Sequence, residues 1–168
     1  YYPSIFQEYT FMIPTFDQKY MAIDCANVLA ANIVPPAGDK STLLDKMITE
    51  GKILYAIQAM LPHKKENDIL KYDQKHWDFC VKNEPQIWAY FINLKLLYNT
   101  KFEQYKYVRD APTTYGMPKE SPGRVGAWLG WQIVKAYMKE NPNTTLKQLI
   151  AMKDGQQLLT ASKYKPKL

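Results

Sequence analysis

The chain has 168 residues, a length that allows one ordinary domain and a core large enough to fold without a metal or a disulfide. Hydrophobic residues make up 46% and charged residues 23%, which excludes a wholly disordered protein. No apolar run approaches the ~18 residues that a membrane span requires. The sequence begins Tyr1-Tyr2-Pro3 without Met or a signal stretch, so we expect it to be part of a longer protein.

The formal net charge of +6 raises the question of nucleic-acid binding. Of the 22 basic residues, only Arg109 and Arg124 are arginine. Bases and phosphates are read best by the bidentate guanidinium, whereas lysine is a hydrated point charge. We therefore expect no nucleic-acid partner and a solvated basic surface, with a weak attraction to anionic polymers or lipid headgroups as the second interpretation.

The chain has two cysteines, Cys25 and Cys80. They are too few for a disulfide scaffold and lack C-x-x-C spacing. We expect both to be small buried side chains, and a single long-range disulfide is the alternative.

Apolar spacing and capping residues predict the helices in chain order. Residues 1–16 are aromatic and broken by prolines, which predicts a loop and a short helix. A helical pattern over 17–33 ends before Pro35-Pro36, and a longer one runs to residue 61 with Asp39 and Ser41 as N-cap candidates. Further helices are predicted over 73–81, 84–98, 102–108, 121–139, 145–152 and 154–163. Asp73 and Asp154 are the expected caps of two of them, and Thr145 with Gln148 forms an expected capping box.

No segment alternates apolar and polar residues over a strand length, so the predicted fold is all-α, a single compact multi-helix domain over residues 1–168. Gly51 lies inside one predicted helix, and Gly126 and Gly130 lie inside another. Glycine costs about 1 kcal/mol relative to alanine in a helix interior, which indicates close packing partners. We expect these two helices to pack against each other and to bring Glu50 and Arg124 into one neighbourhood.

Patterns typical of catalysis are mostly missing. His63 and His76 are the only histidines, and neither has a second histidine three or four residues away, which excludes a His-Glu-x-x-His zinc site. There is no Gly-x-Ser-x-Gly elbow or phosphate-binding loop, and Ser121 is better explained as a helix cap. We expect no metal and no cofactor. Carboxylates that could converge into a hydrolase site are Glu50, Glu84, Glu120 and Asp24.

Four stretches carry a more specific pattern. They are residues 47–55 (MITEGKILY) with the 60–62 (MLP) that follow, 84–98 with E-x-x-I-W-x-Y-F, 121–138 (SPGRVGAWLGWQIVKAYM) and 162–166 (SKYKP). This set, which spans nearly the whole chain, resembles the GldB family, the gliding-motility-associated lipoproteins of Bacteroidetes. The resemblance implies an envelope lipoprotein linked to cell movement, with no settled biochemical activity and a lipid anchor upstream of this chain.

The GldB family is in turn distantly similar to predicted zinc metallopeptidases of the DUF2268 type. In those proteins a His-Glu-x-x-His helix precedes a Glu-Gly helix that would supply the third zinc ligand. Here Glu50-Gly51 resembles the second element, while residues 24–28 (DCANV) stand where the histidines would be, with Cys25 in place of the general base. The similarity implies a degenerate zinc-metallopeptidase scaffold that lacks the machinery, a pseudoenzyme.

From these features we expect a functional cluster on two helices. Its candidate residues are Glu50, Lys52, Tyr55, Arg124, Trp128, Trp131 and Gln132. Arg124 near a helix start is not stabilised by the helix dipole, so we expect a carboxylate partner, Glu50 or Glu120. Each of these residues also has a purely structural interpretation. Glu50 can be an ordinary hydrogen-bonding glutamate, and Trp128 and Trp131 can belong to a core helix in which the Gln132 amide is satisfied.

The leading function is a non-catalytic domain of the cell envelope, facing the periplasm, that binds another envelope protein. Its first alternative is a hydrolase, peptidase-like or with a carboxylate pair, whose active site has no recognised motif. The second alternative is lipid or glycan binding by the aromatic start of the chain, through Tyr1, Tyr2, Phe6 and Tyr9.

Overall fold

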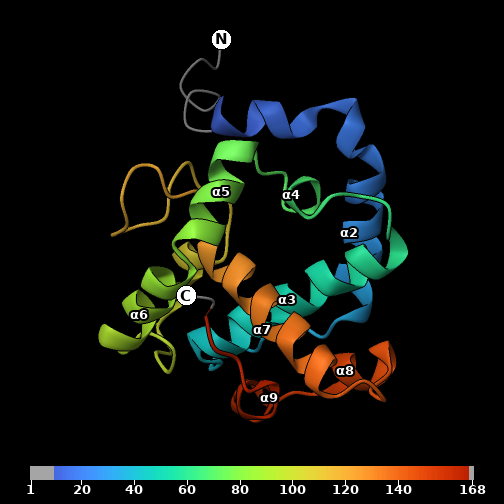
Figure 1. The fold of residues 1–168 in the computed structure, drawn as a ribbon, viewed down its shortest axis with the longest axis vertical. Helices are drawn as coiled ribbons and strands as arrows, with labels where there is room; N and C mark the ends of the chain where they lie inside the picture. The colour runs from blue at the N-terminus through green and yellow to red at the C-terminus, as the bar shows by residue number, and fades with distance from the viewer. Residues whose placement is uncertain (1–9, 167–168) are drawn as a thin grey trace.

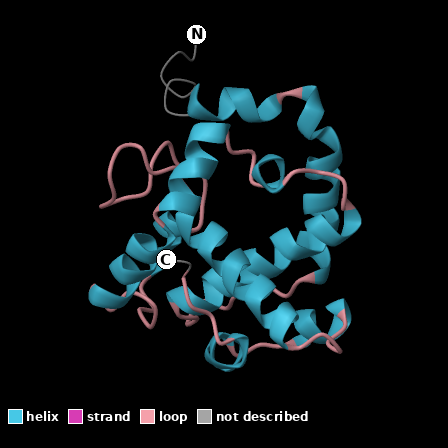
Figure 2. Ribbon diagram, in the orientation of Figure 1, coloured by secondary structure: helices cyan, strands magenta, loops and turns pink. Residues whose placement is uncertain are grey.

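The computed structural model describes residues 10–166 of the chain. This part is built from helices and connecting loops, and it contains no strand (Figure 2). The predicted all-α class is therefore confirmed. In chain order the 3-10 helices (η) and α-helices are η1 (Thr10–Phe16), η2 (Gln18–Tyr20), α2 (Met21–Ile33), α3 (Leu43–Met60), α4 (Glu66–Ile69), α5 (Gln74–Lys82), α6 (Glu84–Asn93), η3 (Phe102–Tyr107), α7 (Val125–Glu140), α8 (Leu146–Ala151) and α9 (Gly155–Ser162).

Helices α3 and α7 pack against each other at the centre of the molecule (Figure 1). A Cβ atom added at Gly51 would overlap the backbone of Gly130, and one added at Gly130 would overlap the carbonyl oxygen of Met47. The predicted glycine contact between these two helices is thus confirmed at Gly51 and Gly130. The prediction that Gly126 belongs to this contact was wrong, because a Cβ atom there would overlap the carbonyl oxygen of Tyr107 in η3.

The core lies around these two helices. Helix α2 packs on α3 through Ile23, Ala26 and Ala30, and α9 packs on α7. The largest fully buried side chains include Trp128, Trp131, Phe91, Met47, Leu54 and Ile57. None of the helices in the described range is long and apolar enough to span a bilayer.

Side-chain caps fix where several helices begin. The carboxylates of Asp73 and Asp154 accept hydrogen bonds from backbone N–H groups of α5 and α9, and Thr145 forms a capping box at α8, all as predicted. The N-cap of α3 is Thr42, so the predictions for Asp39 and Ser41 were wrong. The helix begins after Thr42 because Asp45, three residues further along, forms a reciprocal capping box with it.

The start of α7 also differs from the prediction. The helix begins at Val125, and its N-cap is Arg124 in a left-handed conformation with φ 60°. Ser121, predicted to cap the helix, is buried and its hydroxyl donates to the carbonyl of Pro122. Residues 121–124 therefore form a turn in front of the helix.

The two cysteines are free and have different environments. Cys80 is buried, as predicted, and burial raises the pKa of its thiol. Cys25 is exposed on α2, so the prediction that it is buried was wrong. The helical pattern of residues 17–33 identified the helix correctly but misassigned this face.

The glycine contact gives a stability prediction. Gly130→Ala should lower the free energy of unfolding by about 1 to 3 kcal/mol, because the added methyl group must push α3 and α7 apart. Urea denaturation measures the loss. Gly38→Ala is the matched control, since a Cβ there meets only the Ser41 hydroxyl oxygen at 3.8 Å. Equal stability of the two variants would contradict the close crossing.

Candidate functional site

A cavity of about 330 Å³ opens between η1, α2 and the turn that precedes α7. A volume of this size suits a small ligand or a few side chains of a partner. One part of its wall is apolar and includes Phe11, Phe16 and Ile57. The polar part of the wall consists of Asp24, Asn27, Lys71, His76, Asp110 and Arg124.

Arg124 is the cation on the α7 side of this wall. Its guanidinium lies 3.5 Å from the carboxylate of Glu50 and 3.6 Å from that of Asp110. Of the two partners expected for Arg124, the structure selects Glu50 over Glu120. Asp110 completes the arrangement, and the cation thus lies between two carboxylates.

The loop between residues 110 and 124 is held in place by three contacts. Gly123 lies so close to the backbone of Ala111 that a Cβ would overlap it. The buried Thr114 hydroxyl donates to the carbonyl of Pro122 at 2.6 Å, and the Tyr72 hydroxyl donates to the carbonyl of Gly123. These contacts fix the backbone on both sides of the turn and so position Arg124.

Glu50 is ionisable and half-buried. Burial raises the pKa of its carboxyl, the Arg124 guanidinium opposes that rise, and the nearby Asp110 adds to it. The net effect is a pKa above the usual value of 4.5. Glu50 therefore holds its proton to a higher pH than a solvated glutamate.

A second ion pair stands on the α2 side of the cavity. Lys71 Nζ lies 2.5 Å from Asp24 Oδ1 and donates to the carbonyl of Thr15 at 3.1 Å. Lys71 has a left-handed backbone, with φ 56°, as Arg124 does. Two cationic residues in this less favourable conformation thus line the same cavity, a pattern common at functional sites.

The histidine nearest the cavity is His76, whose Nδ1 lies 3.1 Å from Asp73 and whose ring makes an edge contact with Tyr72. Among residues 10–166, no group of three or more His, Cys, Asp and Glu side chains is placed to hold a metal ion. In the segment compared with the zinc-binding helix, Asp24 and Asn27 line the cavity, whereas Cys25 and Val28 are exposed.

Lys52 lies apart from Glu50, because two residues turn an α-helix by about 200°. It is buried, and its Nζ donates to the carbonyl of Met152 beside a second cavity of about 320 Å³. Burial lowers the pKa of Lys52, and Asp45 partly opposes this effect. Tyr55 is half-buried and packs against the core.

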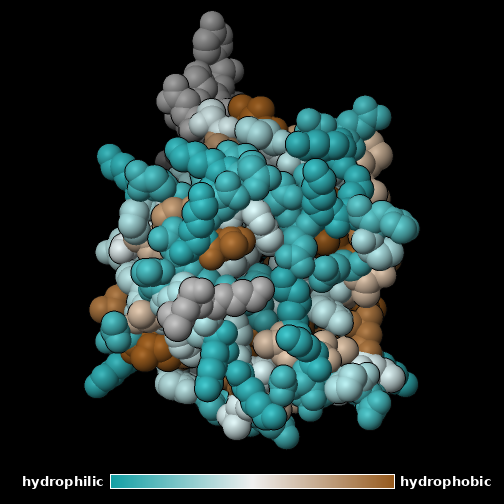
Figure 3. All heavy atoms as spheres, viewed as in Figure 1, coloured by the Kyte–Doolittle hydropathy of each residue, from teal (hydrophilic) through white to brown (hydrophobic). Residues whose placement is uncertain are grey.

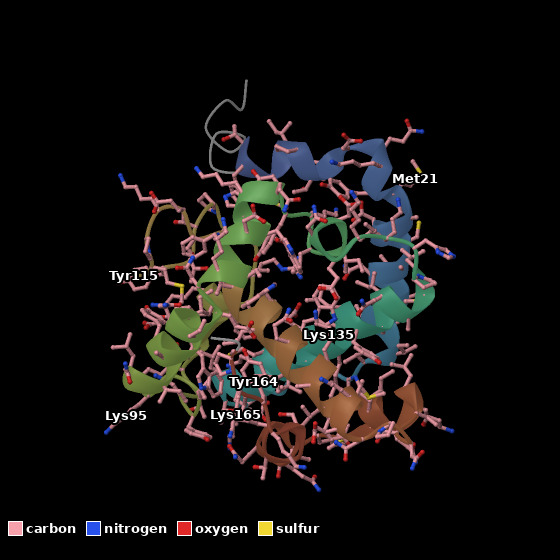
Figure 4. The ribbon with its side chains drawn as sticks, viewed as in Figure 1. Met21, Lys95, Tyr115, Lys135, Tyr164 and Lys165 are labelled. Carbon is pink, nitrogen blue, oxygen red and sulfur yellow. The ribbon has the colours of Figure 1, made fainter. Side chains whose placement is uncertain are left out.

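Trp128 and Trp131 are fully buried, which agrees with the core alternative for this helix. Both indole Nε1 atoms and the Nε2 atom of Gln132 are buried without a hydrogen-bond partner among the described residues, so the expected satisfied amide was wrong. Lys135, which is labelled in Figure 4, lies over the Trp131 ring at 4.7 Å and pairs with Glu66 at 2.8 Å. Of the seven predicted residues, only Arg124 lines the first cavity, and Glu50 contacts it from outside the wall. The functional role of the whole set stays a prediction.

Sequence reasoning missed Lys71 and Asp110. Both lie between the predicted helices, and neither belongs to a recognisable motif. Asp24 was named only as one of several carboxylates that could converge. Their meeting at one cavity follows from tertiary packing, which has no local signal.

The environment of Glu50 predicts a dependence of stability on pH. Because the folded chain binds this proton more tightly than the unfolded chain, its stabilising contribution is present in acid and lost as the pH rises through the folded pKa. Relative to Glu50→Gln, the wild-type chain should therefore lose free energy of unfolding between acid and neutral pH. Urea denaturation across this range measures the trend, with Glu103→Gln at an exposed position as control. A difference that stays flat with pH would contradict the buried environment.

Comparison with known proteins identifies the family of this chain. No curated protein and no solved structure shows a significant match to the chain. The family described as gliding motility protein GldB matches residues 1–166, nearly the whole chain. The chain therefore belongs to the GldB family of gliding motility proteins.

Proposed function

We propose that this chain is a non-catalytic binding domain of the gliding machinery, and that it holds a segment of another envelope protein in the cavity lined by Arg124. The observation that carries the proposal is the loose pairing of this guanidinium. Its carboxylate contacts of 3.5 and 3.6 Å exceed the ~2.7 to 2.9 Å of a strong charge-assisted hydrogen bond. The guanidinium therefore has N–H donors to offer to a ligand.

The wall of the cavity favours a polypeptide ligand. Phe11 and Phe16 supply apolar contact, and Arg124 supplies donors for a carboxylate or a backbone carbonyl. Asp24 and Asn27 supply acceptors for N–H groups. Such mixed walls suit an extended segment that carries both apolar and polar groups.

The location of the domain is part of the same proposal. Membership of a gliding motility family supports a place in the cell envelope. A lipid anchor upstream of residue 1 would hold the domain at the membrane, facing the periplasm. The bound segment would then belong to another component of the envelope.

One observation favours a hydrolase as the second candidate. Glu50 has a raised pKa, as general acids often do, and it contacts Arg124 of the cavity wall. Asp110 supplies a second carboxylate near the same arginine. In a hydrolase the proton of Glu50 would be essential. In a binding domain, Gln at position 50 keeps the shape and a hydrogen-bonding group.

The binding proposal predicts a site-specific crosslink. A photo-crosslinking amino acid at Phe16, which lines the cavity and is 76% exposed, should capture one envelope protein in living cells. The same amino acid at Tyr115, which is 66% exposed but not part of the cavity wall, should not capture it. Mass spectrometry identifies the captured segment. The same capture from both positions would count against the cavity as the binding site.

The two candidates also differ in a motility assay. In a gliding bacterium whose own GldB is replaced by this chain, Arg124→Met should reduce surface spreading severely, whereas Glu50→Gln should largely preserve it. Arg109→Met, at the other arginine of the chain, is the matched control, and immunoblots confirm equal protein levels. Loss of spreading in Glu50→Gln with retention in Arg124→Met would instead support the hydrolase.

A further inference from the structure

Helix α2 is unusually apolar on the side that faces solvent. Met21, Val28, Leu29 and Ile33 are each between 52% and 60% exposed, and Cys25 is exposed among them. Apolar side chains gather along the edge of the molecule that α2 forms (Figure 3), and Met21 points away from its body (Figure 4). This exposed set, Met21, Cys25, Val28, Leu29 and Ile33, is called the α2 face below.

The α2 face is a continuous stripe along the helix. Its residues recur at intervals of three and four, which places them on one side of an α-helix. The opposite side carries Ile23, Ala26 and Ala30, which are buried against α3. The stripe therefore has no partner within residues 10–166.

The stripe also lacks charge. Helix α2 contains no lysine or arginine, and its one charged residue is Asp24. Asp24 lies on the flank that lines the cavity, where Lys71 neutralises it at 2.5 Å. The α2 face is thus electrically neutral, although the chain as a whole has a net charge of +6.

We propose that the α2 face is a self-association surface that binds the α2 face of a second copy of this chain, with the two helices antiparallel about a two-fold axis. The exposed parts of the five side chains amount to roughly 500 Å² per copy, so the pair would bury about 1,000 Å², the lower bound for a specific interface. A dimer of modest affinity fits this area. The proposal goes beyond the binding function inferred for the cavity.

The lack of charge on the α2 face favours a second copy of this chain over an anionic membrane or a different protein. Helices that lie on anionic membranes carry lysine or arginine on the polar face and often Trp or Phe on the other, and α2 has none of these. A different protein partner is usually selected by complementary charges, which the α2 face lacks. A neutral stripe meets its own copy without like-charge repulsion, as a two-fold interface requires.

The chain has a natural reporter for this arrangement. Cys25 lies near the middle of the stripe, and an antiparallel pair centred near residue 27 keeps the two thiols within about 6 Å along the helix axis. Cys80 is buried, so a short bis-maleimide should react selectively with Cys25. Covalent dimers should form in wild-type protein at micromolar concentration and be absent from Cys25→Ser.

Sedimentation equilibrium of the intact 168-residue chain tests the interface itself. The wild-type mass should rise from monomer toward dimer in the micromolar range, and Leu29→Glu should weaken association at least tenfold. Leu94→Glu, at a similarly exposed leucine that is the C-cap of α6, is the matched control and should associate like wild type. Circular dichroism confirms that both variants fold.

Three results would overturn the proposal: a wild-type chain that stays monomeric at several hundred micromolar, a dimer that survives Leu29→Glu, or vesicle binding through the same face by a monomer. None of these bears on the cavity. Conversely, a failure to capture a partner from Phe16 would contradict the binding function of the cavity but not the dimer. The two proposals can therefore fail separately.

Discussion

The backbones of α3 and α7 meet at Gly51 and Gly130 without a side chain between them. This contact fixes how far apart the two helices lie and where each residue faces its neighbour. Glu50 is adjacent to Gly51, and Arg124 is six residues before Gly130, about 9 Å along the helix direction. The ion pair between Arg124 and Glu50 and the partial burial of Glu50 therefore depend on a crossing that tolerates no larger residue.

The turn before α7 places Arg124 in the wall of the cavity. Arg124 adopts a left-handed conformation that costs a non-glycine residue about 1 kcal/mol or more. The contacts of Gly123, Thr114 and Tyr72 hold the turn in that conformation. The backbone of the turn therefore sets the position of the guanidinium at the cavity wall. Its long contacts with Glu50 and Asp110 follow from that position.

Much of the fold could be predicted from local patterns. Capping chemistry located the starts of α5, α8 and α9, because a cap depends on residues only three positions apart. The glycines of α3 and α7 indicated their contact for a similar reason, since an interior glycine is costly unless a neighbour requires it. The Glu50–Arg124 pair followed from that contact.

The composition of the cavity wall and the exposed face of α2 could not be predicted, because they depend on contacts between residues far apart in the sequence. Lys71 and Asp110 reach the cavity from loops, and Lys52 was separated from Glu50 by the turn of its own helix. The exposed side of α2 has an ordinary helical pattern, and only the positions of the surrounding elements show that most of its apolar residues are exposed.

Helix α2 connects the two proposals physically. One flank supplies Asp24 and Asn27 to the cavity, and the outward face carries Val28 and Leu29. In an antiparallel pair of α2 helices, the two-fold axis passes between the two helices, so one cavity would lie beside the interface in each copy. A dimer would therefore present two copies of the same binding site, and a partner with two suitable segments would be held more tightly than either site alone can hold it.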